Sequence, residues 1–203
     1  MNLNPTETAV VVLHLQNDII VNQQALGAMM GGEATRRNVV GEASKLLQAA
    51  DAASVLPILV RVASRPDRSN MLLNLPLTQG TLDMNALIDG EPGAEFVDGL
   101  ARVASEVVVT HQNPNPFVGS DLHDVLQRRG TKTLVMCGVA TNMAVLSTAF
   151  AAASLGYRMI VVPEACSALN EETHQFALQT LGMLAEIVAI DDVVTALSEP
   201  AAA

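Results

Sequence analysis

The sequence predicts a single-domain α/β fold with a six-stranded parallel sheet and helices on both faces. Its 203 residues are enough to bury one large core. Six runs are almost continuously apolar instead of alternating, which is typical of strands covered on both sides. Helical patterns alternate with these runs, as in a doubly wound, Rossmann-like three-layer arrangement. We therefore expect residues 1–203 to form one domain.

Short runs rich in Val, Ile and Leu are the predicted strands. None of them shows the period of two that marks a half-exposed strand. Parallel pairing then requires right-handed helical crossovers between them. In chain order the predicted strands are 9–15, 54–62, 105–111, 132–138, 157–163 and 185–190.

Five segments between and after these runs have the residue pattern of helices. Ser120, Thr141 and Asn170 are side chains that commonly cap the first turn of a helix. Gly130 and Gly156 are typical residues just beyond a helix C-terminus. The last segments also carry acidic residues in the first turn, which suits the positive end of the helix dipole. The predicted helices are 33–53, 119–130, 140–156, 170–184 and 191–199.

Two segments, 18–32 and 63–92, have no clear period. The second is long for a connection, and long loops in compact domains are usually lids or interface segments. Its apolar residues either line a pocket or contact a second subunit, and we favour the contact. They are Met71, Leu72, Leu73 and Leu75. We expect 198–203 to form a flexible tail.

Composition excludes several classes of partner. The net charge of −10 and a pI near 4.7 argue against nucleic acid and against an anionic membrane surface. Aromatic residues make up only 2%, which leaves few rings for stacking a nucleobase or a flavin. A mean hydropathy of +0.33 indicates apolar surface buried between subunits, so we expect a homo-oligomer, a dimer or larger.

The sequence favours a cytoplasmic location. The two cysteines, Cys137 and Cys166, form no CxxC motif or disulfide framework. No basic residue precedes Arg36, so the start lacks the basic region of a signal peptide. The uncharged span 133–157 is interrupted by polar residues and fits a buried strand, turn and helix better than a membrane span.

Polar residues stand where the predicted strands end, which is where open parallel sheets bind ligands. His14 ends the first strand and His111 the third, so the two rings are candidates for one acid–base site. The alternative is that His14 is a buried ring bonded to the backbone. We expect His123 and His174 to be surface or half-buried helix residues. Further substrate-binding candidates at these strand ends are Gln16, Arg61, Asn113, Thr141 and Asn142.

The order of motifs resembles the isochorismatase-like superfamily, also called cysteine hydrolases. The resemblance covers nearly the whole chain, and the motifs are specific for the fold when taken together. It implies a six-stranded parallel sheet and frequent assembly into dimers or larger oligomers. The matching pieces are VVVLHLQND at 10–18, SVLPILVRV at 54–62, EPGAEFVDGL at 91–100, VVVTHQNPNPFVGSDLHDVL at 107–126, the run 133–168 and EETHQFAL at 171–178.

The resemblance implies a catalytic triad of Asp, Lys and Cys, and this sequence departs from all three positions. His14 stands in the Asp position, and His111, six residues before Phe117, stands in the Lys position. Ala144 stands in the Cys position, so Phe117 and Ala144 are expected to border the substrate. Isochorismatases proper also lack the cysteine, but they keep the acidic residue. Many members bind a metal after the second strand; RVASRPDRS here has no histidine, so we expect neither metal nor cofactor.

A side-chain nucleophile is hard to find in this sequence. Alanine cannot attack a carbonyl carbon, which excludes acyl-enzyme chemistry at Ala144. Cys137 lies inside a predicted strand, and Cys166 follows another. Ser147, one turn after Ala144, is expected to point toward the core. We regard these three residues as weak candidates and expect water to be the nucleophile.

Three hypotheses follow for the function. The first is a hydrolase-like enzyme that hydrolyses or hydrates a small polar molecule, with His14 and His111 as acid and base. In this hypothesis Arg61 holds an anionic group of the substrate, and the helix start at Thr141–Asn142 polarises a carbonyl. The second is a catalytically inactive member that binds a small molecule or a partner subunit. The third, which we rank lowest, is a metal site on the two histidines with Asp18 or Glu164.

Overall fold

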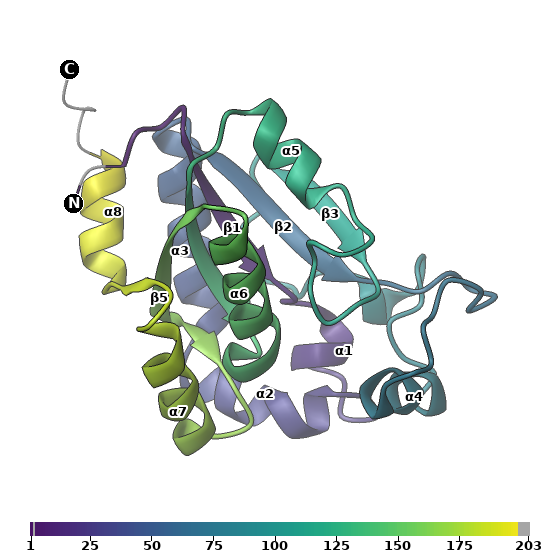
Figure 1. Ribbon diagram of the computed structural model, residues 1–203. Helices are drawn as coiled ribbons and strands as arrows, with labels where there is room; N and C mark the ends of the chain where they lie inside the picture. Colours follow the sequence, from purple (N-terminus) through teal and green to yellow (C-terminus); the bar gives the residue numbers. More distant parts are fainter. Residues whose placement is uncertain (2, 199–203) are drawn as a thin grey trace.

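The six-stranded, all-parallel sheet that the sequence predicts is confirmed. The structure is a computed structural model, and it describes residue 1 and residues 3–198. The sheet has the order β3-β2-β1-β4-β5-β6, so the chain winds outward from the centre in both directions (Figure 1). The strands are β1 (Thr8–Leu13), β2 (Leu56–Val62), β3 (Val107–His111), β4 (Thr133–Val139), β5 (Arg158–Ser167) and β6 (Glu186–Ile187).

Helices cover both faces of the sheet. In Figure 1, α3 lies behind the sheet and α6 lies in front of it, which gives the three layers expected of a doubly wound fold. No helix among the described residues is long and apolar enough to cross a membrane. The helices are α1 (Asn17–Ile20), α2 (Gly27–Arg36), α3 (Val39–Ala52), α4 (Pro76–Asp83), α5 (Leu122–Arg128), α6 (Leu146–Ser154), α7 (Glu171–Leu181) and α8 (Ile190–Ser198), with short turns at η1 (Pro92–Ala94) and η2 (Thr141–Val145).

The central strand β1 is buried along its whole length. It pairs with β2 on one side and β4 on the other, and Leu13 lies opposite both Val60 and Gly138. Gly138 has φ +124°, and a Cβ there would lie 2.1 Å from the carbonyl oxygen of Leu13. Glycine is therefore required for β4 to approach the end of β1 this closely.

Several predicted elements differ from the observed ones. The helix predicted over 33–53 is two helices, because Asn38 has φ 52°, a left-handed conformation that ends α2 before α3 begins. The segments predicted to be irregular contain α4 and most of α1 and α2. The sixth strand is only two residues long, 186–187, at the edge of the sheet. The predicted tail 198–203 lies outside the described residues except for Ser198, which ends α8.

Predicted helix caps are right in part. The Asn170 side chain accepts a hydrogen bond from the Thr173 amide, as predicted for the start of α7. Ser120 accepts from the Leu122 amide, but α5 begins only at Leu122. Thr141 is not a cap, because its hydroxyl is paired with His174 and the segment begins as a π-helical turn, η2.

Adjacent glycines in α2 provide a test of how α1 is packed. A Cβ on Gly31 would lie 2.2 Å from the carbonyl oxygen of Ile20, whereas a Cβ on Gly32 would meet nothing within 4 Å. We expect Gly31→Ala to lower the free energy of unfolding by about 1–3 kcal/mol through overpacking. Gly32→Ala should raise it by roughly 0.5–1 kcal/mol, since alanine favours the helix.

Urea unfolding of the two variants beside the parent protein measures both changes. Equal effects of the two substitutions would contradict the close approach of α1 to α2.

Candidate active site

His14 and His111 meet at the carboxyl edge of the sheet. Their Nε2 atoms are 2.7 Å apart, and the rings are stacked with centroids 4.9 Å apart. β1 ends just before His14, β3 ends at His111, and β2 separates these two strands in the sheet. The rings therefore meet across the end of β2. Positions 97 residues apart in the chain thus form one direct contact.

The backbone after β1 turns the His14 ring into this position. His14 has φ 61°, a left-handed conformation that is uncommon for residues other than glycine. Its amide donates to the carbonyl of Val60 at 2.9 Å, and its carbonyl accepts from the Gln16 amide. His111 is the last residue of β3, and its carbonyl accepts from the Ala63 amide. The main chain therefore holds both rings.

Burial keeps both rings neutral. His14 is 6% exposed and His111 is fully buried. Burial, and then the neighbouring His111 ring, hold the pKa of His14 well below its usual value, and a backbone hydrogen bond with Val139 partly opposes this. Burial lowers the pKa of His111 to about 4, with a smaller opposing effect from the Asn113 backbone. At neutral pH the pair carries no charge.

A neutral pair of this geometry has one donor end and one acceptor end. Two neutral imidazoles share two N–H protons, and one of these lies in the Nε2–Nε2 hydrogen bond. The ring that accepts at Nε2 must carry its proton on Nδ1, and the other ring has a bare Nδ1. Transfer of the shared proton alone would leave an imidazolium beside an imidazolate, so it must be accompanied by proton gain or loss at Nδ1. Nδ1 of His111 is buried without a hydrogen-bond partner among the described residues, whereas His14 lines the neighbouring cavity. Proton exchange with a ligand therefore goes through His14.

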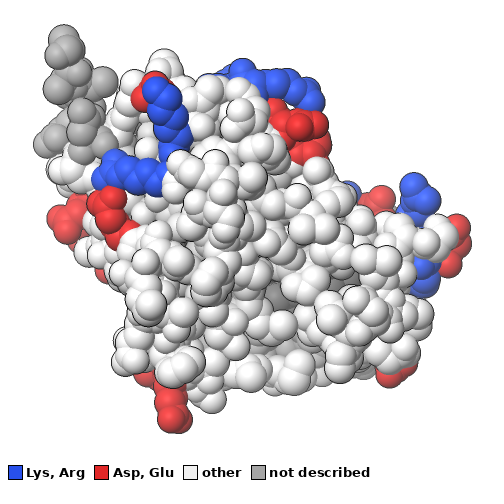
Figure 2. Space-filling model, in the orientation of Figure 1, with Lys and Arg blue, Asp and Glu red and all other residues white. Residues whose placement is uncertain are grey.

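A cavity of about 220 Å³ opens beside His14. Ile19 of α1, Met29 and Met30 of α2, and Leu77 of α4 form apolar walls, while η2 forms another wall. No Lys, Arg, Asp or Glu among the described residues lines it. Figure 2 shows a hollow in the middle of a face that is largely uncharged, with charged side chains toward its margins. The sequence analysis predicts a small polar substrate, but the cavity lining is more apolar than a site for such a substrate would be.

Three of the predicted substrate-binding residues line this cavity. They are Asn113, Asn142 and Ala144. The side-chain amide of Asn113 donates to the carbonyl of Val118, whereas Oδ1 of Asn142 is buried with no hydrogen-bond partner. Asn142 is therefore a free acceptor at the cavity wall.

Gln16 has a structural role and does not line the cavity. It is fully buried, and its amide nitrogen donates to the carbonyls of Val62 and Ala94. Its Oε1 accepts from the Val62 amide at 2.8 Å. The side chain thus pairs backbone groups that no strand partner reaches, and the structure does not support the expected substrate contact.

Arg61 and Phe117 also lie away from the cavity lining. Arg61 forms ion pairs with Asp89 and Glu95 and donates to the hydroxyl of Thr110. Phe117 packs against the rings of His123 and Tyr157. Arg61 points outward because β2 alternates its faces, so it is not placed to hold a substrate anion in the cavity.

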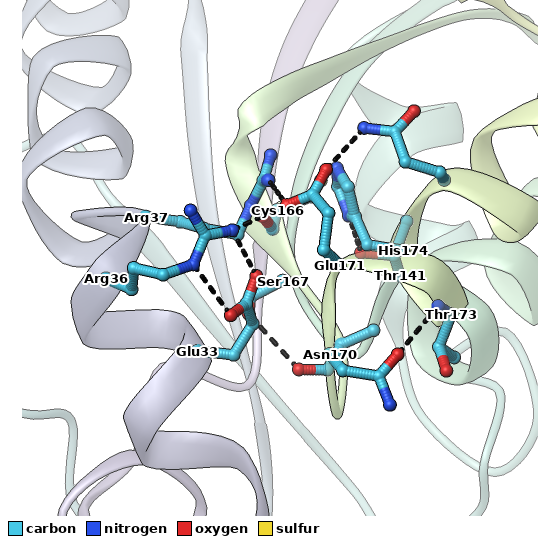
Figure 3. Close-up of polar contacts among 12 residues, drawn as sticks. Glu33, Arg36, Arg37, Thr141, Cys166, Ser167, Asn170, Glu171, Thr173 and His174 are labelled. Atoms are coloured by element: carbon cyan, nitrogen blue, oxygen red, sulfur yellow. Dashed lines mark hydrogen bonds and ion pairs between the residues drawn. The ribbon is translucent and has the colours of Figure 1, made fainter.

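His174 is a site-related residue that the sequence analysis missed. We expected a surface or half-buried residue, but His174 is fully buried, and its Nδ1 lies 2.8 Å from the Thr141 hydroxyl (Figure 3). Thr141 is the first residue of η2 and does not line the cavity itself, so the contact ties that wall to α7. The acidic first turn of α7 gave no signal of this burial.

Arg37 links α2 to the elements beside His174. Its guanidinium donates to the carbonyls of Pro163 and Cys166 on β5 and pairs with Glu171 of α7 (Figure 3). The side chain satisfies strand carbonyls that would otherwise be unpaired. It also fixes the end of α2, which carries part of the cavity wall.

Neither cysteine nor Ser147 is placed as a nucleophile. Cys137 and Cys166 are fully buried, and neither lines the cavity. Burial raises the pKa of Cys166 to about 12 and that of Cys137 well above its usual value. The Ser147 hydroxyl donates to the carbonyls of Pro114 and Ala144. These groups are occupied or held in the unreactive thiol form.

Among the described residues, the two histidines and the acidic ligands considered above are not arranged around one metal position. Within residues 1 and 3–198, no group of three or more His, Cys, Asp or Glu side chains is arranged to hold a metal ion. Asp18, one of the ligands considered above, accepts from the Asn22 side chain and from the amide of Leu87. Glu164, the other, does not line the cavity.

The chain is similar to isochorismatase-family proteins along most of its length. The isochorismatase domain matches residues 8–192. An uncharacterised isochorismatase family protein, YecD of Escherichia coli O157:H7, is 30% identical over 97% of this chain and 100% of its own length. A probable inactive nicotinamidase of Arabidopsis thaliana is 29% identical over 82% of this chain and 84% of its own. The solved structure of an isochorismatase family protein from Burkholderia thailandensis superposes with a TM-score of 0.79 at 31% identity, covering 98% of both chains.

Thiol reactivity tests the burial of the cysteines. We expect neither of the two thiols to react with a disulfide reagent in the folded protein, and both to react in urea, because burial disfavours the thiolate. An Ala144→Cys variant is the positive control, since residue 144 lines the cavity, and it should gain one thiol that iodoacetamide alkylates. Rapid reaction of the folded parent protein would contradict the assigned burial.

The lowered histidine pKa values make stability depend on pH. The pKa of His111 and that of His174 are about 4 in the folded protein and about 6.5 in the unfolded chain. The unfolded chain therefore binds more protons below pH 6.5, and the free energy of unfolding falls as the pH falls toward 4. The slope is about 1.4 kcal/mol per pH unit for each proton.

Urea titrations between pH 5 and 6.5 measure this slope above the range where carboxylates titrate. His174→Gln should reduce it by up to one proton, whereas Thr180→Ala, on the same helix, removes no titratable group and should leave it unchanged. An unaltered slope in the His174→Gln variant would refute the assignment.

Proposed function

The chain belongs to the isochorismatase family, and we propose that it is a hydrolase-like member in which His14 and His111 move protons while water replaces the missing cysteine nucleophile. The single observation that carries this proposal is the 2.7 Å contact between the two Nε2 atoms beside a cavity that His14 lines. Hydrogen-bond reach is the first requirement for an acid–base pair.

The two histidines have different roles in this proposal. His14 lines the cavity and exchanges protons with the substrate, whereas His111 does not line it. His111 is a positioning residue whose Nε2 stays hydrogen-bonded to Nε2 of His14. As water attacks the substrate, His14 takes a proton from the water at Nδ1 and then gives that proton to the leaving group. Both rings therefore begin and end the reaction neutral.

The neutral state of the pair supports this use. Imidazolium has no lone pair and cannot accept a proton, so a base at neutral pH must start as the neutral form. Burial lowers the pKa of both rings, which provides that form. General acid–base catalysis contributes roughly 10²–10⁴ in rate, and the close walls of the cavity would add positioning.

Asn142 and Ala144 complete the proposed site. Both lie in η2 and line the cavity with His14. Ala144 leaves space where similar proteins carry a cysteine, and that space would hold the attacking water. Oδ1 of Asn142 has no partner and would accept a hydrogen bond from the substrate or from this water.

A second candidate function is a binding subunit without turnover. The Arabidopsis relative is described as a probable inactive nicotinamidase, and Ala144 leaves no acyl-enzyme route here. Under this alternative the cavity would still bind a small molecule, and the histidine pair would serve packing alone.

We also propose a cytoplasmic homo-oligomer that binds no nucleic acid. Two free, buried cysteines suit a reducing compartment, and the net charge of −10 disfavours nucleic acid. Large apolar side chains on α6 and α7 are exposed, including Phe150 at 51% and Phe176 at 69%. Surfaces of this kind are commonly buried between subunits.

Turnover measurements separate the two candidates. On a panel of small amides, esters and enol ethers, we expect measurable hydrolysis by the parent protein. His14→Asn and His111→Asn should each lower kcat/KM by about 10²-fold or more, because the first removes the acid–base group and the second removes the hydrogen bond that orients it. His123→Asn is the matched control, since His123 packs on Tyr157 outside the cavity, and its activity should stay within about twofold of the parent value.

Turnover that survives both active-site substitutions would refute the proposed mechanism. Absence of turnover over the whole panel, combined with binding of a panel member, would favour the binding subunit.

A further inference from the structure

The cavity beside His14 has no charged group in its wall. Its lining contains no Lys, Arg, Asp or Glu among the described residues, and two nearby arginines, Arg61 and Arg68, are occupied elsewhere. Arg68 donates to the Ser64 hydroxyl, the Ala86 carbonyl and the Asn85 side chain. Arg61 is paired with Asp89 and Glu95. None of these cations is free to meet a ligand in the cavity.

The histidine pair does not supply the missing charge. Burial keeps the pKa of both His14 and His111 below neutrality, so the cavity is uncharged near pH 7. A carboxylate or an ammonium group entering it would lose its hydration without gaining a counter-charge, and this is strongly unfavourable. The wall therefore selects against ions of either sign.

Most polar atoms of the lining are already hydrogen-bonded within the protein. The hydroxyls of Ser64, Thr78 and Thr81 donate to backbone carbonyls. The side-chain amides of Gln112 and Asn113 also donate to carbonyls. Oδ1 of Asn142 is different, because it is buried and has no partner among the described residues. A ligand that enters can offer it an N–H or O–H donor.

The remaining wall is flexible and apolar. Four methionines, two of them on α2, line the cavity, and the unbranched thioether adapts to irregular apolar shapes. The volume of about 220 Å³ lies below the roughly 300–1,000 Å³ of pockets for drug-sized ligands. The methionines are Met29, Met30, Met71 and Met143.

We propose that this cavity takes an uncharged small molecule whose apolar body packs against the methionines and whose N–H or O–H donates to Oδ1 of Asn142. The inference rests on the proposed function only in placing the substrate beside His14. It narrows the substrate class from any small polar molecule to neutral compounds with an apolar body and one donor group.

Methionine-methyl NMR of the intact protein tests the proposal. The probes are hexanamide, hexanoate and hexylammonium, which have similar chains and differ in charge. We expect hexanamide to shift the methyl signals of the four lining methionines and to leave Met183, which is 84% exposed and outside the cavity, unchanged. The two ions should bind at least about 100-fold more weakly because of their desolvation.

The Asn142→Ala variant tests the donor contact. It should weaken hexanamide binding by about 2–10-fold, the usual effect of one hydrogen bond, and should not weaken binding of N,N-dimethylhexanamide, which has no N–H. Stronger binding of hexanoate or hexylammonium than of hexanamide, or unshifted lining methyls at saturating hexanamide, would overturn the inference.

These outcomes are distinguishable from those of the proposed function. Methyl shifts with hexanamide but no turnover of any neutral compound would leave this inference standing and remove the proposed function. Turnover of charged compounds that depends on His14, with no methyl shifts on addition of hexanamide, would support the proposed function and remove this inference.

Discussion

The central strand β1 is buried on both faces and along both edges, and the site is built from its carboxyl end. β4 approaches that end closely because Gly138 has no side chain to meet the carbonyl of Leu13. β2 holds the other edge, where the His14 amide donates to Val60. The His14 ring can therefore occupy only a narrow region above the sheet. The contact with His111, the cavity and the wall formed by η2 all follow from that position.

Burial of the histidine pair imposes a second, electrostatic constraint, which acts on the charge of the two rings. Two rings with Nε2 atoms 2.7 Å apart are not both charged, and their burial favours the neutral state of each ring. The same neutrality extends over the cavity lining, where the described residues contribute no charged side chain. In this protein the histidine pair and the uncharged pocket are thus parts of one environment. A charge introduced on the wall would change both.

Several polar residues that stand at strand ends serve the backbone instead of a ligand. Gln16 pairs backbone groups of Val62 and Ala94, and Asp18 accepts from the amide of Leu87. Arg37 donates to carbonyls near the end of β5. Loops that leave a buried sheet have main-chain groups without strand partners, and these groups must be paired. A polar residue at such a place is therefore ambiguous until its partners are known.

The sequence by itself determined the α/β class, the six parallel strands and the placement of His14 and His111 at the same sheet edge. These features follow from local patterns, since continuous apolar runs and alternating helices suffice to predict a parallel sheet. The resemblance in motif order also predicts that Ala144 stands at the nucleophile position, and this assignment stays a prediction. Burial of Cys137 could be predicted because it lies inside an apolar strand.

Only the tertiary structure decided which polar residues face the cavity. Arg61 points away from it into ion pairs, and His174 is buried against Thr141. The sequence also did not predict that the cavity lining is uncharged, because the lining residues come from α1, α2, α4, η2 and the strand ends. Side-chain direction, partner choice and cavity lining depend on contacts between distant segments. Local periodicity carries no information about those contacts.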